Sequence, residues 1–185
     1  MDSDVFKSLV GFYNCEWLSN RLLIKRGESN SGIDLVDDPY FLGIELKSKD
    51  RHFNPRNFAV DNRQVRQYPR QNPGHILYWA FMIYSSQKRP EELKPEDRLQ
   101  DLLQDREVWF LPWEWIRKFP IHRCKTADYR YPSIRDFPKS DYFRTQDLDE
   151  GIFHIPKGMA IDKRMKDLSN GSKRRKLEGL MDVPF

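Results

Sequence analysis

The stretch GIDLVDDPYFLGIELKSK, residues 32–49, predicts two extended strands joined by a tight turn. The turn falls at residues 37–39, Asp-Asp-Pro, because Asp side chains bond to nearby backbone amides and Pro terminates strands. After the turn, apolar and polar residues alternate, which is typical of a strand with one buried face. Glu45 and Lys47 therefore share a face, about 7 Å apart along the strand, and the hairpin brings Asp34 beside them.

Two carboxylates and one amine on a common face form a candidate site for holding a divalent cation and a water molecule. Asp34 lies within an apolar run, where an unpaired carboxylate is energetically costly. A solvated strand face is the alternative interpretation, and it is the commoner one for a bare acid-x-Lys tripeptide. The apolar setting of Asp34, the tight turn between the two acids and the basic segment that follows favour a functional site.

The composition predicts one core domain with an appendage. The chain has 185 residues, of which 38% are hydrophobic and 32% charged, enough apolar content for a core with a well-solvated surface. No apolar run approaches the length of a membrane span and no signal peptide opens the chain, so we expect no membrane association. The two cysteines, Cys15 and Cys124, exclude a disulfide scaffold and suit the reducing cytoplasm.

Basic residues are concentrated in two segments of a chain whose net charge is only +4. Residues 47–71 hold seven basic residues against two acids, and residues 157–178 hold eight against three. Concentrated positive charge favours a polyanionic partner. For the C-terminal segment considered alone, an ordinary solvated surface is the alternative interpretation.

Periodicity and turn residues predict an alternation of helices and strands. Helices are predicted over residues 4–26, 57–68, 95–106 and 113–119, and strands over residues 32–36, 40–49, 76–84 and 108–111. This order predicts an α/β domain over residues 1–120, with a small mixed sheet flanked by helices. Residues 121–185 form a C-terminal extension of short strands or a wrapping arm, expected to serve DNA recognition or dimerisation. Within it, residues 169–176, SNGSKRRK, are expected to be mobile unless bound.

These elements and residues resemble the PD-(D/E)XK nuclease superfamily over residues 4–120. The motif elements occur in order: an acid on the first helix, Gly-Ile-Asp, Glu-Leu-Lys, and Gln-x-x-x-Tyr on the following helix. They correspond to Glu16, Gly32, Asp34, Glu45, Lys47, Gln64 and Tyr68. The chain departs from the family pattern at Ile33, which stands where a Pro often precedes the Asp. The resemblance implies a restriction-endonuclease-like fold and metal-dependent hydrolysis of phosphodiester bonds.

The resemblance also implies roles for individual residues. The expected ligands of Mg²⁺, for which Mn²⁺ can substitute, are Asp34, Glu45, Leu46 (through its main-chain carbonyl) and Glu16. Lys47 would orient or help to deprotonate the attacking water, and Gln64 would position that water or a DNA phosphate. The residues expected to bind DNA are Lys49, Arg51, Arg63, Arg66, Tyr68 and Arg70.

Three groups within the superfamily share features with this chain. The early Glu16 and the compact core are similar to archaeal Holliday junction resolvases, and the Gln64–Tyr68 pair is similar to nucleases of the RecB and lambda type. Glu-Leu-Lys-Ser, followed by a helix and an aromatic strand at residues 78–81, is similar to small type II restriction enzymes. Because residues 121–185 exceed what a minimal resolvase needs, we expect a restriction-type enzyme. Cutting both strands of a duplex usually takes two active sites, so we also expect a homodimer.

Other classes of function account for fewer of these features. A DNA-binding module without catalysis explains the basic segments, but acids facing a phosphate without a metal would repel it. His122 and Cys124 are close in sequence, yet the paired spacing of a four-ligand zinc site is missing. Cys15 has no nucleophile motif around it, and the absence of a Gly-rich phosphate loop predicts that the protein uses no nucleotide cofactor.

Overall fold

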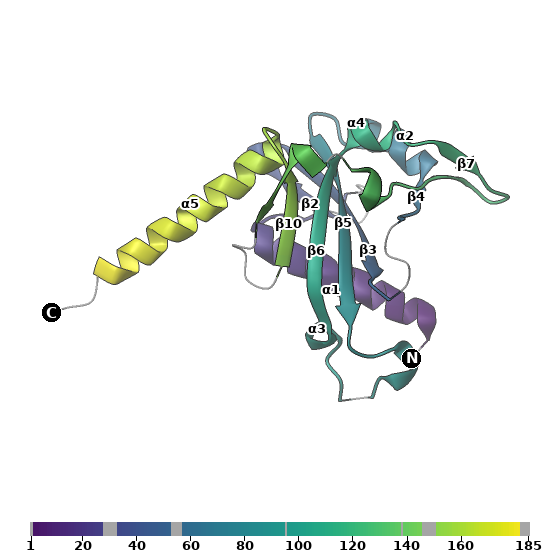
Figure 1. The fold of residues 1–185 in the computed structure, drawn as a ribbon, viewed down its shortest axis with the longest axis horizontal. Coiled ribbons are helices and arrows are strands. Elements are labelled where there is room, and N and C mark those ends of the chain that lie inside the picture. The colour runs from purple at the N-terminus through teal and green to yellow at the C-terminus, as the bar shows by residue number, and fades with distance from the viewer. Residues whose placement is uncertain are drawn as a thin grey trace.

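A mixed seven-stranded sheet forms the centre of the molecule, with helices on both faces (Figure 1). The computed structural model describes residues 2–27, 33–52, 57–94, 96–137, 139–145 and 151–181. The helices are α1 (Ser3–Leu22), α2 (Asn62–Gln71), α3 (Leu99–Leu102), α4 (Trp113–Ile116) and α5 (Ala160–Met181). The strands are β1 (Lys25–Arg26), β2 (Leu35–Asp37), β3 (Leu42–Asp50), β4 (Val60–Asp61), β5 (Ile76–Ser86), β6 (Leu103–Pro112), β7 (Ile121–Arg123), β8 (Asp128–Arg130), β9 (Tyr142–Thr145) and β10 (Gly151–Pro156).

The strand order of the large sheet is β1-β2-β3-β5-β6-β10-β9. Strands β1, β2 and β3 form an antiparallel meander, whereas β3 pairs with β5 in parallel and α2 provides the crossover between them. Strand β6 runs antiparallel to β5 and parallel to β10. A smaller antiparallel sheet, β4-β8-β7, lies beside α2 (Figure 1). The predicted α/β class, with a mixed sheet flanked by helices, is confirmed.

Two apolar layers cover the two faces of the large sheet. On one face, Leu18 and Leu22 of α1 and Ile161 of α5 join one cluster with Ile44 and Leu46 of β3. This layer shows that α1 and the first part of α5 share a face of the sheet.

The opposite face is covered by α2 and α4. Val65 and Tyr68 of α2 and Ile116 of α4 cluster with Trp79 and Phe81 of β5. Because β5 is buried on both faces between β3 and β6, the predicted central strand is confirmed.

The β2–β3 hairpin has the alternation that the sequence predicts. Ile44 and Leu46 face α1, while Glu45 and Lys47 are register partners of Trp79 and Phe81 and so face the α2 side. The turn consists of a short 3₁₀ segment at Asp38–Tyr40. Gly32, the first residue of the predicted strand, lies outside the described residues.

Helix α1 begins as predicted but ends earlier. The carboxylate of Asp2 caps its first turn by accepting hydrogen bonds from the amides of Asp4 and Val5. The predicted helix continues to residue 26, whereas α1 ends at Leu22, followed by Leu23 in the left-handed conformation with φ 51°. The chain then forms strand β1, which pairs with β2. This pairing supplies hydrogen-bond partners to backbone groups of β2 that would otherwise be unpaired at the edge of the sheet.

The helix predicted over residues 95–106 is mostly wrong. Of the described residues 96–106, only Leu99–Leu102 is α-helical, and the chain becomes strand β6 at Leu103. Strand β6 lies between β5 and β10, so its backbone groups bond on both edges. Pairing of this extent outweighs the modest helix propensity of the segment.

Helix α2 continues past residue 68, where the predicted helix ends. Pro69 lies inside the helix, which extends to Gln71. Since proline has no amide hydrogen, it leaves the carbonyl of Val65, four residues earlier, without its helical donor. The indole Nε1 of Trp113 on α4 donates to that carbonyl at 2.7 Å. A tertiary contact therefore satisfies the group that proline leaves unpaired.

The C-terminal segment is joined to the core more closely than the predicted division at residue 120 implies. Strands β9 and β10 belong to the large sheet, and α5 includes residues 169–176. The expectation that these residues are mobile unless bound stays a prediction. The parallel pairing of β10 with β6 connects distant parts of the chain, so a local sequence pattern cannot predict it. The far part of α5 extends away from the body (Figure 1). None of the described helices is long and apolar enough to cross a membrane.

A buried ion pair fastens α5 to the hairpin. Arg164 Nε donates to Asp37 Oδ2 at 2.5 Å, and both side chains are nearly inaccessible. Arg164 Nη2 also donates to the carbonyls of Leu22 and Leu23 at the end of α1. One guanidinium thus connects three elements that are remote in sequence.

We predict that Arg164→Ala destabilises the protein by about 3–5 kcal/mol, because it leaves the buried Asp37 carboxylate without a counter-charge. Denaturant unfolding would measure this loss. Lys163→Ala, on the exposed neighbour, should change the free energy of unfolding by less than about 0.5 kcal/mol. Asp37→Asn in the Arg164→Ala background should restore part of the stability. Equal stability of the Arg164 and Lys163 variants would contradict the anchoring role.

Candidate active site

Strand pairing places Asp34 next to Glu45 at the start of β2. The amide of Asp34 donates to the carbonyl of Ile44 at 3.1 Å, which extends the β2–β3 ladder by one residue. Asp34 Oδ2 accepts a hydrogen bond from the amide of Leu46 at 2.6 Å. These two bonds orient the Asp34 carboxylate toward the middle of β3. The juxtaposition of the two acids predicted from the hairpin is present.

Glu45 lies at the centre of a compact polar cluster. It is only 6% exposed, although its charge would normally keep it in water. Its Oε1 accepts hydrogen bonds from Lys47 Nζ at 2.7 Å and from Gln64 Nε2 at 2.5 Å. The structure therefore brings together four predicted residues: Asp34, which precedes β2, Glu45 and Lys47 on β3, and Gln64 on α2.

The surroundings of Glu45 shift its protonation equilibrium. The pKa of Glu45 is raised to about 7, mainly by burial and also by the nearby Asp34 carboxylate, although Lys47 and Gln64 act in the opposite direction. A carboxylate with this pKa is poorly compensated by its present neighbours. Additional positive charge beside Asp34 and Glu45 would favour its ionised form.

The oxygen donors at this position fit a hard divalent cation. Mg²⁺ is commonly held by one or two carboxylates, with waters and phosphate oxygens completing its shell. The Leu46 amide points toward Asp34, and the amide and carbonyl of one strand residue point to the same edge, so the Leu46 carbonyl also faces Asp34. Asp34, Glu45 and this carbonyl can therefore hold the ion. In the described residues, no group of three His, Cys, Asp or Glu side chains is arranged for metal binding.

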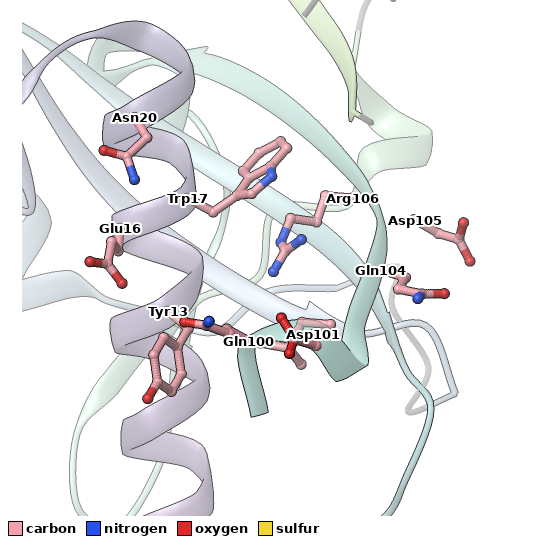
Figure 2. Close-up of a pocket in the computed structure, with 10 residues that line it drawn as sticks. Tyr13, Glu16, Trp17, Asn20, Gln100, Asp101, Gln104, Asp105 and Arg106 are labelled. Atoms are coloured by element: carbon pink, nitrogen blue, oxygen red, sulfur yellow. The ribbon is translucent and has the colours of Figure 1, made fainter. Parts of the chain in front are cut away.

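The predicted contribution of Glu16 to this site does not agree with its position. Helix α1 covers the face of the sheet opposite to Glu45 and Lys47. Glu16 is exposed and lines a separate cavity of about 690 Å³ between α1 and the start of β6. Figure 2 shows Glu16 on the α1 side of this cavity, with Arg106 on the β6 side. The prediction placed Glu16 correctly on a helix but could not tell which sheet face that helix covers.

Tyr68 supports the site from inside the core. Its side chain is completely buried, with its ring centroid 4.9 Å from that of Trp79. Its hydroxyl donates to the carbonyl of Tyr78 at 3.4 Å, and burial raises its pKa well above the usual value. The expected contact of Tyr68 with DNA is therefore wrong, and the residue instead holds α2, and with it Gln64, against the sheet.

Two of the predicted DNA-binding residues lie along the same edge as Lys47. Lys49 shares its strand face and donates to the carbonyl of Asn57 at 3.0 Å. Arg51 is exposed, donates to the carbonyl of Asp105 at 3.3 Å and approaches Glu107 at 3.7 Å. Both residues thus carry positive charge along β3 beyond Lys47, although each has a protein partner.

The other three predicted DNA-binding residues, Arg63, Arg66 and Arg70, are exposed on α2. Arg63 lies 3.8 Å from Asp61, which also caps the helix. The structure adds Arg117 and Arg130, two basic residues that the motif did not single out, to the predicted Arg66. Burial lowers the pKa of Arg130, and the charges of Arg117 and Arg66 lower it further. Only the tertiary structure brings these three guanidiniums together.

The cysteines and the remaining zinc candidates are consistent with structural or surface positions. Cys15 is buried, and burial together with Asp34 raises the pKa of its thiol to about 11, so the thiol stays protonated. His122 and Cys124 are exposed on and beside β7.

A comparison of the chain with models of known protein families gave no match, and neither did a comparison with curated protein sequences.

We predict that the stability of the metal-free protein falls between about pH 4.5 and pH 7 because of Glu45. Glu45 keeps its proton in the folded protein to a higher pH than in the unfolded chain, so its stabilising contribution is complete below pH 4.5 and lost as the pH rises through 7. Thermal unfolding across this range should show a decline in Tm that Glu45→Gln removes. The exposed control Glu114→Gln should keep the wild-type profile, and identical profiles for all three proteins would refute the assignment.

Proposed function

We propose that the protein is a Mg²⁺-dependent endonuclease that hydrolyses phosphodiester bonds in duplex DNA, in the manner of a small restriction enzyme. The observation that carries this proposal is the convergence of Asp34, Glu45, Lys47 and Gln64 on one face of the sheet. The β2–β3 hairpin, the α2 crossover and the parallel β3–β5 pair support a restriction-endonuclease-like fold. Mn²⁺ should substitute for Mg²⁺, since both accept oxygen ligands.

The chemistry divides among the residues of this cluster. A bound Mg²⁺, held by Asp34, Glu45 and the Leu46 carbonyl, would lower the pKa of a bound water and offset charge on the phosphate. Lys47 lies within hydrogen-bond reach of Glu45 and can orient the attacking water or offset phosphate charge beside it. Gln64 holds the Glu45 carboxylate in place through its amide.

The charge distribution around the cluster favours DNA as the substrate. Exposed arginines lie on α2, the helix that carries Gln64, and basic residues follow Lys47 along β3, so positive charge is available to offset the repulsion between the carboxylates and a phosphate. A non-catalytic DNA-binding module would gain nothing from two adjacent acids. We place the enzyme in the cytoplasm because Cys15 and Cys124 are both free thiols.

Cleavage assays on a supercoiled plasmid and on a labelled four-way junction should test this function. We expect discrete plasmid fragments with Mg²⁺ and none with EDTA. Symmetric nicks in the junction with the plasmid spared would instead identify a Holliday junction resolvase, and progressive loss from ends a RecB- or lambda-type nuclease. DNA binding that is equal with and without chelator, without cleavage, would identify a binding module and overturn the proposal.

In the same assay, Lys47→Ala should reduce cleavage by about a hundredfold or more, because it removes the group that orients the water. DNA affinity measured in Ca²⁺ should change little. Lys94→Ala, which removes an exposed charge far from the cluster, should cleave as the wild type does. Wild-type cleavage by the Lys47 variant would show that the site is wrongly assigned.

We also propose that the enzyme acts as a homodimer, because each chain contains one such cluster and a duplex has two strands to cut. Analytical ultracentrifugation should detect a species of twice the 22.3 kDa chain mass, at least when duplex DNA is present. A single monomeric species both with and without DNA would contradict the dimer while leaving the hydrolytic site untouched.

A further inference from the structure

The small sheet β4-β8-β7 ends in a two-stranded ribbon that projects from the body beside α2 (Figure 1). The residues of β7 and the turn that follows, 121–126, are all exposed. The pairing of β7 with β8 is regular over three residue pairs. The ribbon is therefore a defined element with an open surface and not a strand covered by the core.

The base of the ribbon is fixed to the helix that carries Gln64. Arg130 Nε donates to Asn62 Oδ1 at 3.0 Å, and Arg130 Nη1 donates to the carbonyls of Arg117 and Phe119. Asn62 precedes Gln64 by two residues, which is a rise of about 3 Å along α2. A chain of direct contacts therefore connects the ribbon to the Glu45 carboxylate.

One face of the ribbon carries two arginines and one acid. The register pairs Arg123 with Asp128 and Ile121 with Arg130, so the side chains of Arg123, Asp128 and Arg130 share this face, and the positive charge gathers around Arg130 at its base. Arg66 and Arg117 lie close enough to Arg130 for their charges to help lower its pKa. Among the residues that the structure describes, no ion pair joins Arg66, Arg117 or Arg123 to a carboxylate. Such a cluster favours an anionic partner over solvent.

The other face of the ribbon is stiffened by aromatic rings. The His122 and Tyr131 ring centroids are 5.3 Å apart, and those of Tyr129 and Tyr131 are 6.2 Å apart. Contacts of this kind along a short ribbon limit its twisting and bending. These rings lie on the face opposite to that of Arg123 and Arg130.

We propose that the β7–β8 ribbon enters the major groove of duplex DNA and sets the sequence preference of the enzyme. The B-DNA major groove is wide enough for a two-stranded ribbon, and arginine reads guanine through two hydrogen bonds to its O6 and N7. Arg123 contacts base edges, while Arg66 and Arg117 contact phosphates at the groove margin. The inference rests on the proposed function for its choice of DNA as partner.

The test uses binding alone, in the Lys47→Ala background with Ca²⁺, so that it does not depend on cleavage. Duplexes with a randomised centre are selected by the protein and sequenced. The parent protein should select a consensus, and methylation of guanine N7 within it should block binding. Arg123→Ala should lower the preference at one position by about five- to 150-fold, the range expected for losing a bidentate contact.

Arg66→Ala and Arg117→Ala should behave differently, because phosphate contacts carry no sequence information. Each should weaken binding to all duplexes and reduce the salt dependence of log K by about one, with the consensus unchanged. Arg98→Ala is the matched control, since Arg98 is an exposed arginine next to α3, remote from the ribbon (Figure 1). It should leave both affinity and consensus as in the parent.

Three outcomes would overturn the proposal: no consensus for the parent protein, an unchanged consensus for Arg123→Ala, or equal affinity for an RNA duplex of the selected sequence. The RNA result is decisive because the deep, narrow major groove of A-form RNA excludes a ribbon. A selected consensus that changes with Arg123, in a wild-type protein that does not cleave, would uphold this inference and refute the nuclease function.

Discussion

The burial of one carboxylate, Glu45, is the constraint on which the candidate site depends. A charged group with 6% exposure requires partners, and the chain provides them from two directions: Lys47 from the same strand and Gln64 from α2. Asp34 adds a second negative charge nearby, so these partners do not fully compensate the pair. The negative charge left on Asp34 and Glu45 would favour the binding of a cation, which the proposed chemistry requires.

The rest of the fold holds these partners in register. Tyr68 packs against Trp79 and keeps α2 on the sheet, and the Trp113 indole satisfies the carbonyl that Pro69 leaves open. On the opposite face, Arg164 connects α5 to the hairpin turn through Asp37. Both faces of the sheet therefore contribute to the position of β3, although only one face carries the polar cluster.

The same helix that orients Glu45 also supports the small sheet. Asn62 and Gln64 lie within one turn of α2, and they contact Arg130 and Glu45 respectively. This arrangement would couple the proposed catalytic site at the large sheet to the proposed recognition ribbon through one helix. Residues 121–185, which were expected to be an appendage, are interleaved with the core, because β10 pairs with β6 and β8 pairs with β4.

The sequence alone determined the β2–β3 hairpin, the alternation that places Glu45 with Lys47, and the buried strand β5, because these depend on local patterns of period two and on turn residues. It also located Gln64 on a helix after the hairpin. Only the tertiary structure decided which sheet face each helix covers, which removes Glu16 from the cluster and buries Tyr68. Long-range pairing likewise converted the predicted helix at residues 103–106 into β6. These outcomes depend on contacts between distant segments. The free energy of such contacts is not part of the local propensity of a segment.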